Sequence, residues 1–342
     1  MRLEATVPLL VLTAISVNLE LVLLINGLGR GQSALATATV LLAFHLGYLA
    51  AGHLLGVKSR ILVAAALIGT VGTLIGLLTG SLLISVPLVM VLSSTLQALR
   101  RQLKAQGRPQ SSVKNATKCA AMMIAGLAIS ATGLLVVGLA WLAGITLFAH
   151  FARPVVVPAT SSEAAPGRPN ESRLLLATEW LHHAHYFTYC YTFWRLIPAL
   201  PVGAVGVLFS IGWAAYFVAE VMVGRTRHFS MVILAFGHLV CAACLFAMAA
   251  ATTLAPMMFL WFVTGVGGGT AYMLNNGPQV RGRERAEDLG HATGTMAGGT
   301  LATMVGAKAA LDWAAYLAIA TACTAIVVHF YLKKTRRRHV CV

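Results

Sequence analysis

The chain is poor in charged residues, and poorest in negatively charged ones. Of its 342 residues only 10% are charged, with 10 Asp and Glu against 25 Lys and Arg. A soluble domain of this length needs more charge to cover its surface, so the composition excludes an ordinary soluble protein. The sequence also lacks a Gly-x-x-x-x-Gly-Lys phosphate-binding loop, which excludes the common ATP-driven machinery. Its 6 cysteines fall mostly within apolar runs, so we expect no disulfide framework.

Long apolar runs make up most of what remains. Hydrophobic residues account for 58% of the chain. A helix needs about 20 apolar residues to cross the hydrocarbon layer, and about 12 windows reach or approach that length. The sequence therefore predicts an all-α integral membrane protein with about 12 transmembrane helices. The windows are 6–26, 35–56, 61–79, 81–99, 118–138, 139–152, 178–198, 202–223, 230–250, 254–275, 291–309 and 313–331.

The basic residues predict the orientation of these spans. When the windows alternate across a bilayer, every Lys and Arg except Arg30, Arg195 and Lys308 falls on one side. Basic residues gather on the cytoplasmic side, so both termini are expected to be cytoplasmic. The net charge of +15 is then a topology signal, and we expect no nucleic-acid partner. The high content of Ala, Gly, Val and Arg, with few Lys, indicates a GC-rich bacterial genome and hence the bacterial inner membrane.

A polar stretch near the midpoint divides the chain in two. Residues 153–172 hold four prolines together with Ser, Thr, Glu and Gly, a composition typical of an irregular linker. On either side, the segments Tyr48–Arg60 and Tyr216–His228 resemble each other and join the second span of their half to the third. This repeat predicts two six-helix pseudo-repeats. The expected parts are an N-terminal half (1–153), a cytoplasmic linker (154–177), a C-terminal half (178–332) and a basic tail (333–342).

The turn after the second span carries a family resemblance. In the first half it has a glycine and two basic residues, and in the second half an acidic residue is followed by a glycine and basic residues. On these motifs the chain resembles a compact member of the major facilitator superfamily, although Gly56 stands at the family's acidic position. The resemblance implies a secondary transporter that works by alternating access, with both turns contributing to its gate. The implied gating residues are Gly52, Lys58, Arg60, Glu220 and Arg225.

The seventh predicted span is the most aromatic and histidine-rich part of the chain. At helical spacing, five of its residues form one stripe, and aromatic rings with polar tips suit a planar or amphipathic ligand. We therefore expect this stripe to bind substrate. The alternative interpretation is an aromatic belt at the membrane interface, which accounts for Trp180 better than for the deeper residues. The stripe consists of His182, His185, Tyr186, Tyr189 and Phe193.

Glu20 is the acidic residue expected to couple transport to protons. It lies in the outer half of the first span, where a carboxyl group is costly unless it faces a partner or a watery cavity. Such a group can bind a proton in one conformation and release it in another. The alternative is a solvated Glu20, or one paired with Arg30. His45 and His53 lie in the second span and His238 in the ninth, and we interpret each as a packing residue.

The function predicted from these features is an ion-gradient-driven secondary transporter. We expect it to export a small organic molecule, such as a natural product, a drug-like compound or a metallophore. Its partners would be the substrate, the lipid bilayer and a proton or other coupling ion, and we expect no cofactor, no bound metal and no enzymatic activity. Two alternatives remain: a ten-span exporter of the drug/metabolite type, and a membrane-embedded metalloenzyme built on His182, His183 and His185.

Overall fold

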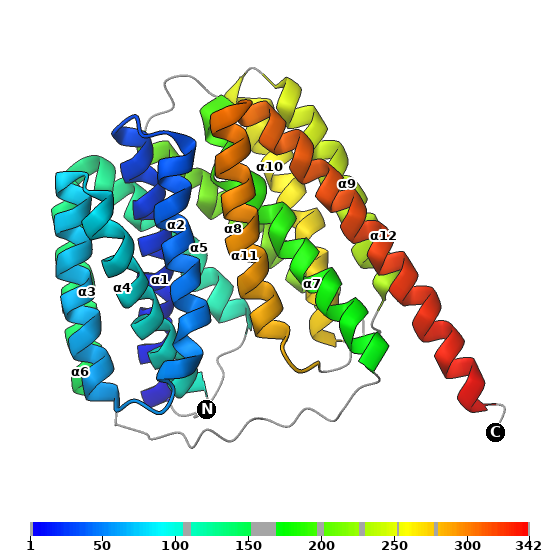
Figure 1. The fold of residues 1–342 in the computed structure, drawn as a ribbon, viewed down its shortest axis with the longest axis horizontal. Coiled ribbons are helices and arrows are strands. Elements are labelled where there is room, and N and C mark those ends of the chain that lie inside the picture. The colour runs from blue at the N-terminus through cyan, green and yellow to red at the C-terminus, as the bar shows by residue number, and fades with distance from the viewer. Residues whose placement is uncertain are drawn as a thin grey trace. The chain divides into compact units, whose positions relative to one another are not determined.

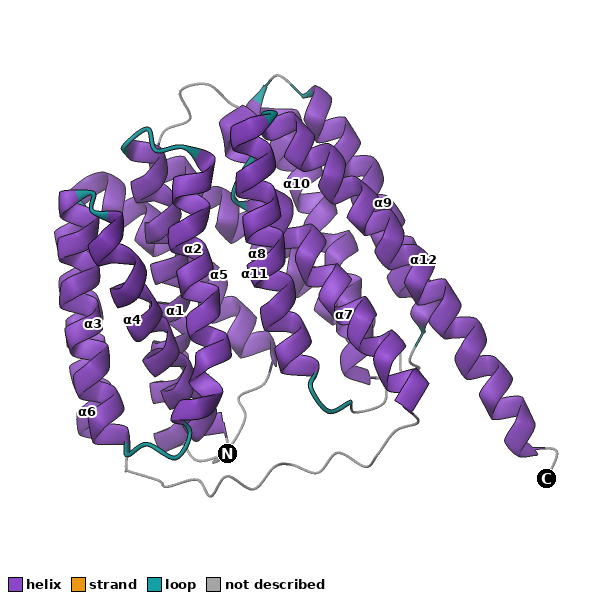
Figure 2. Ribbon diagram, in the orientation of Figure 1, coloured by secondary structure: helices purple, strands orange, loops and turns teal. Residues whose placement is uncertain are grey.

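The described part of the chain is a set of helices joined by short turns (Figures 1 and 2). The computed structural model describes residues 3–104, 111–151, 169–196, 202–225, 230–251, 253–276 and 280–340. Within these ranges no residue lies in a β-strand. The all-α prediction is therefore confirmed for the part of the chain that is described.

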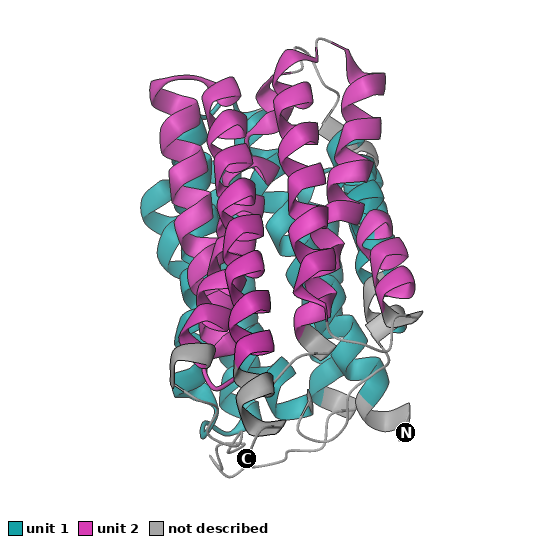
Figure 3. Cartoon of the chain, turned by 90° about the vertical axis from the view of Figure 1, so that its right-hand side faces the viewer, with its two compact units in different colours: residues 1–161, 199–213 teal, residues 162–198, 214–342 magenta. Residues whose placement is uncertain are grey.

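Two compact units divide the helices between them (Figure 3). Unit 1 comprises residues 1–161 and 199–213, and unit 2 comprises residues 162–198 and 214–342. The helix α8 contributes to both. The predicted linker falls largely outside the described residues, and the pseudo-repeat of two six-helix halves stays a prediction.

The helices of unit 1 are α1 to α6. In this unit α3 and α2 pack on α4, while α1 packs on α5 and α4. The helices are α1 (Leu3–Gly29), α2 (Ala34–Ala50) with the short 3-10 turn η1 (Ala51–Leu54), α3 (Ser59–Thr79), α4 (Leu82–Lys104), α5 (Ser111–Thr132) and α6 (Leu134–Phe151).

Unit 2 is built mainly from α7 and α9 to α12. Here α11 packs along α7, and α12 packs along both α9 and α7 (Figure 1). The elements are α7 (Pro169–Cys190), η2 (Phe193–Leu196), α8 (Val202–Arg225), α9 (Met231–Ala250), α10 (Leu254–Gly269), η3 (Thr270–Asn276), α11 (Arg283–Met304) and α12 (Ala307–Val340).

Eight helices are long and apolar enough to cross a membrane, judged by length and composition within the described residues. They are α1, α2 with η1, α3, α4, α8, α9, α10 with η3, and α12. Shorter apolar segments lie in α5 (Ala116–Ile129) and α6 (Leu134–Ala149). The chain is thus a multi-pass membrane protein, and the full count of twelve spans stays a prediction.

Three element boundaries differ from those expected from the sequence. The break between α5 and α6 falls at Gly133 instead of near Gly138, because Gly133 adopts a φ of 83°, which L residues with a side chain rarely tolerate. The helix α7 begins at Pro169, a residue that fits a first helical turn, and ends earlier than expected, at Cys190. The helix α11 begins at Arg283, eight residues before the expected window 291–309.

A stripe of glycines lets α11 approach α7 at backbone distance. Gly290, Gly294 and Gly298 recur every four residues, so they share one face of α11. A Cβ added at Gly294 would lie 2.3 Å from the carbonyl oxygen of Ala184, and one at Gly298 would meet the carbonyl oxygen of Thr188. This glycine spacing thus marks a close helix contact, which fixes α7 against α11.

We expect Gly294→Ala to destabilise the protein by about 1–3 kcal/mol, because the added methyl group forces two helix backbones apart. Thermal unfolding in detergent measures this effect. Gly56→Ala is a matched control, since a Cβ there meets nothing within 4 Å. Equal unfolding temperatures for the two variants would contradict the close contact.

Candidate functional site

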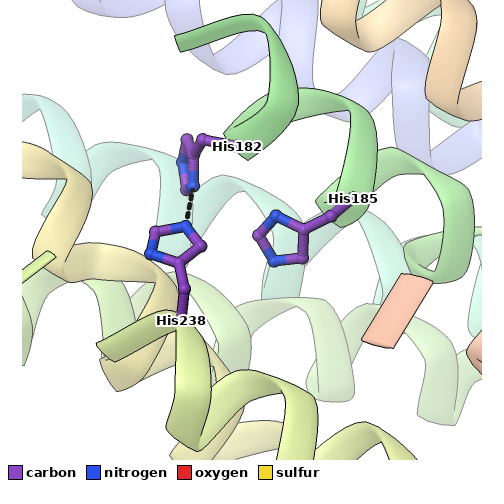
Figure 4. A group of neighbouring side chains, drawn as sticks. All are labelled: His182, His185 and His238. Carbon is purple, nitrogen blue, oxygen red and sulfur yellow. Dashed lines mark hydrogen bonds between the residues drawn. The ribbon is translucent and has the colours of Figure 1, made fainter. Parts of the chain in front are cut away.

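Three buried histidines converge in unit 2. His182 and His185 lie on α7, one turn apart, and His238 lies on α9, which runs close enough to bring the three rings together (Figure 4). One nitrogen of each ring lies within 4.8 Å of the corresponding nitrogens of the other two. All three side chains are buried, with exposed fractions of 2%, 0% and 0%. We call these residues the histidine triad.

Hydrogen bonds define the protonation of two members of the triad. Nδ1 of His238 lies 2.8 Å from the carbonyl oxygen of Leu234, which only accepts, so His238 carries its proton on Nδ1. Its Nε2 therefore accepts a hydrogen bond from Nδ1–H of His182 across 2.9 Å. The backbone of α9 thus holds the Nε2 lone pair of His238 toward the two histidines of α7.

His185 differs from the other two members. The carbonyl groups of Leu181 and His182 lie near its ring. Neither ring nitrogen meets hydrogen-bond geometry with any group in the described part of the chain, and both nitrogens are buried. A buried imidazole nitrogen without a partner costs about 1–3 kcal/mol. The triad therefore contains one imidazole, that of His185, whose buried nitrogens lack a well-formed hydrogen bond.

A second polar group adjoins the triad on the same helix. The His183 ring lies 4.7 Å from the His182 ring, centroid to centroid. Nδ1 of His183 and Nε2 of His291 on α11 are 2.9 Å apart, and Glu287 lies 4.0 Å from His291 Nε2. The two groups form a continuous run of imidazoles between α7, α9 and α11.

Glu179 anchors this second group. Its carboxylate accepts hydrogen bonds from Nε and Nη2 of Arg283 at 3.1 and 3.3 Å, and it lies 3.4 Å from Nε2 of His183. Glu179 is only 5% exposed. A carboxylate that is buried this far needs such partners, so the pair ties the start of α11 to α7.

An aromatic cluster continues from the triad toward α10. The Tyr189 ring stacks on His185 with centroids 6.1 Å apart, and it meets Trp261 of α10 edge-on at 5.8 Å. Tyr186 also stacks with Trp261, with centroids 6.2 Å apart, and the Phe193 ring lies 4.6 Å from the Trp261 ring. The indole of Trp261 is thus the common neighbour of the aromatic residues of this region.

The structure brings the predicted substrate-binding residues together. His182, His185, Tyr189 and Phe193 are buried and Tyr186 is half-buried, all within unit 2. Phe193 lies in η2, beyond the end of α7, so the helical stripe ends at Tyr189 and does not include Phe193. The Phe193 ring joins the aromatic cluster through its contact with Trp261. That these residues bind substrate stays a prediction.

Three residues of this region were not recognised from the sequence as its members: His238, His291 and Trp261. Each lies on a different helix from α7, so its proximity depends on tertiary packing. The sequence did offer one signal for the histidines: an ionisable side chain in an apolar helix usually belongs to a functional site. We interpreted His238 as a packing residue because it stands alone in its span.

The other predicted residues lie elsewhere in the fold. Glu20 is half-buried in α1 of unit 1. Gly52, Lys58 and Arg60 are exposed around the turn between α2 and α3. Glu220 is half-buried in α8, and the side chain of Arg225 lies outside the described residues. Coupling by Glu20 and gating by these residues stay predictions.

The turn between α2 and α3 is tied to α4. The amide of Gln102 donates to the carbonyl oxygens of Leu55 and Val57 at 3.1 and 3.0 Å, and its oxygen accepts from the Ser59 hydroxyl at 3.0 Å. One buried side chain thereby fixes the backbone that carries Lys58 and Arg60.

No family model and no curated protein sequence matches the chain. Solved structures of transporters do. The human organic anion transporter MFSD10 (TETRAN) superposes with a TM-score of 0.62 at 12% identity, over 95% of this chain and 100% of that chain. A POT family transporter, solved with a thioalcohol-conjugated peptide, gives 0.69 at 11% identity over 95% and 96%. A bacterial homologue of the iron transporter ferroportin, in an inward-facing state, gives 0.65 at 14% identity over 97% and 99%.

At these identities the comparisons show the fold. The chain shares its fold with these transporters over nearly the whole length of each, in agreement with the resemblance that the turn motifs indicated. Each of these three structures is described as that of a transporter or of a transporter homologue.

Proposed function

We propose that the chain is an ion-gradient-driven secondary transporter that moves a small organic molecule by alternating access. The observation that carries the proposal is the buried face of α7, where imidazole and phenol groups meet Trp261 inside a fold shared with transporters. Polar groups are costly within an apolar helix bundle, so a face this rich in them points to a solute that passes it. Export is the direction we propose, because the compact aromatic character resembles that of efflux members of the superfamily.

The α7 face suits an aromatic or amphipathic solute. Tyr186 and Tyr189 offer ring faces beside hydroxyl groups, and His182 and His185 add imidazole edges. Sites for small organic ligands combine apolar walls with a few fixed polar groups, which is the composition found here. In this state Tyr189 is 1% exposed, so an opening of the bundle would have to precede binding.

Two further roles complete the proposal. Glu20 takes up and releases the coupling proton, and the turn residues Gly52, Lys58 and Arg60 together with Glu220 and Arg225 form the gate. The support for the gate is the exposed, basic turn that Gln102 holds in place. The support for Glu20 is its half-buried position in an apolar helix that is long enough to cross the membrane.

The proposed location is the bacterial inner membrane, with both termini in the cytoplasm. The asymmetry of Lys and Arg along the chain supports this orientation. Reporter fusions after Arg173 and Arg338 measure it, and a periplasmic signal after Arg173 would place the central linker on the wrong side.

A flux assay in proteoliposomes tests the function. Protein reconstituted into vesicles should move a member of a panel of planar organic solutes when a pH gradient is imposed. Tyr189→Phe, which removes one buried hydroxyl group, is expected to raise the apparent KM about 2- to 10-fold, the value of one hydrogen bond.

Tyr316→Phe is the matched control, because Tyr316 is 58% exposed on α12. It is expected to leave the apparent KM unchanged. The same KM for wild type, Tyr189→Phe and Tyr316→Phe would remove the α7 face from the substrate path.

A further inference from the structure

We propose that the histidine triad, His182, His185 and His238, is a binding site for a divalent first-row transition-metal ion. The inference rests on the proposed function, because it names a ligand class for the same face of α7. It also departs from the main prediction of the sequence analysis, which expected no bound metal and considered His182, His183 and His185 as ligands only in the metalloenzyme alternative. The reason is that α9 supplies the third imidazole (Figure 4).

The first argument is convergence. One nitrogen from each of the three rings lies within 4.8 Å of the others. In a tetrahedral site with metal–nitrogen bonds of about 2.0–2.1 Å, ligand nitrogens stand about 3.3 Å apart. The His185 ring makes no side-chain hydrogen bond in the described structure, so a rotation that closes this gap would break none.

The second argument is the support behind the ligands. His238 donates Nδ1–H to the carbonyl oxygen of Leu234 at 2.8 Å. Metal-binding histidines usually donate their remote N–H in this way, which fixes the tautomer and aims the lone pair at the metal. The lone pair of His238 accepts a hydrogen bond from Nδ1–H of His182 across 2.9 Å, and a metal ion between the two rings would take the place of the proton in that bond.

The third argument is the incomplete interaction of His185. The nearby backbone groups of Leu181 and His182 are acceptors, so they can interact only with an N–H of this ring. Its lone-pair nitrogen has no donor in the part of the chain that the structure describes. A metal ion supplies the electron-pair acceptor that this buried nitrogen lacks.

The ligand chemistry selects the class of metal. Neutral imidazole suits Zn²⁺, Co²⁺, Ni²⁺ and Cu²⁺, whereas Mg²⁺ and Ca²⁺ require oxygen ligands. Within the described residues the triad offers three ligands, which leaves a coordination position open in a tetrahedral arrangement. An open position suits an ion that must leave again, or one that arrives with an organic ligand already attached.

Cobalt binding to the purified full-length chain tests the proposal. The protein is isolated in detergent through a tag without histidine, treated with a chelator and titrated with Co²⁺, whose visible absorption reports coordination by nitrogen. Wild type is expected to bind about one Co²⁺ per chain at the triad. His185→Ala and His238→Ala are each expected to lower the affinity for Co²⁺ at least about 100-fold. Removing a group that hydrogen-bonds to a metal ligand already lowers metal affinity by about 10- to 100-fold, and removing the ligand itself should cost more.

Two controls make the result specific. His45→Ala removes an equally buried histidine from α2 in unit 1, and His291→Ala removes one from the adjoining polar group. Both are expected to bind Co²⁺ like wild type. If His238→Ala unfolds in the absence of metal, His185→Gln replaces it, because the ring of His185 contributes no side-chain hydrogen bond to be lost.

The outcomes separate this proposal from the transporter proposal. No Co²⁺ binding by wild type, or equal binding by wild type, His185→Ala and His185→Gln, would overturn the metal site, even if flux of a metal-free solute is observed. Binding that depends on His185 and His238 supports the site, even if no member of the solute panel is transported.

Discussion

Glu20→Gln is expected to abolish transport driven by a pH gradient and to leave substrate binding and exchange intact. The amide has the size of the protonated carboxyl group but cannot release a proton. A carrier that needs the deprotonated form to complete its cycle would stop, whereas exchange of substrate across the membrane does not require that step. The expected effect is therefore a loss of net flux and not a loss of affinity.

Glu20 suits this experiment because of its place in α1. The side chain is half-buried between the buried residues Leu19 and Leu21, in a helix whose central segment is long and apolar enough to cross the membrane. A carboxyl group in an apolar helix lowers the stability of the protein in the membrane, so its presence there favours a functional role.

Asp312→Asn is the matched control for Glu20→Gln. Asp312 pairs with Lys308 at 3.2 Å near the start of α12, and both side chains are partly or largely exposed. The same loss of charge there is expected to leave net flux unchanged. Gradient-driven flux at the wild-type rate in Glu20→Gln would remove Glu20 from the coupling mechanism.

The fold could be predicted from the sequence because its signals are local or statistical. Apolar runs locate the helices, and the basic turn after Gly52 points to the major facilitator type. The boundaries were less predictable because they depend on single residues. Gly133 ends α5 through its positive φ, and Arg283 and Glu284 begin α11 in a charged segment before the apolar window that starts at residue 291.

The site was predictable only along one helix. The spacing of His182, His185 and Tyr189 showed that they share a face, because positions three and four apart on a helix are neighbours. The partners of that face are His238 on α9 and Trp261 on α10. No spacing rule connects them to α7, since their proximity depends on how the helices pack. The glycine stripe of α11 favours a close helix contact, but its spacing does not identify α7 as the partner.

Removal of the carboxylate that joins α7 to α11 should have the largest effect on stability. Glu179→Ala is expected to lower the free energy of unfolding by about 2–4 kcal/mol, because it leaves two donors of Arg283 and the His183 ring without their acceptor. The full cost of an unpaired buried charge is not expected, since the side chain of Arg283 is 27% exposed and can reach water. Denaturant unfolding in detergent measures the difference.

The exposed pair of Lys308 and Asp312 provides the comparison. Asp312→Ala breaks an ion pair of similar length on the protein surface, where such pairs contribute at most about 0.5 kcal/mol. In the double variant Glu179→Ala with Arg283→Ala, the two losses are expected not to add, because each substitution removes the same pair of hydrogen bonds. A Glu179→Ala variant as stable as Asp312→Ala would show that the part-buried ion pair contributes nothing to the contact between α7 and α11.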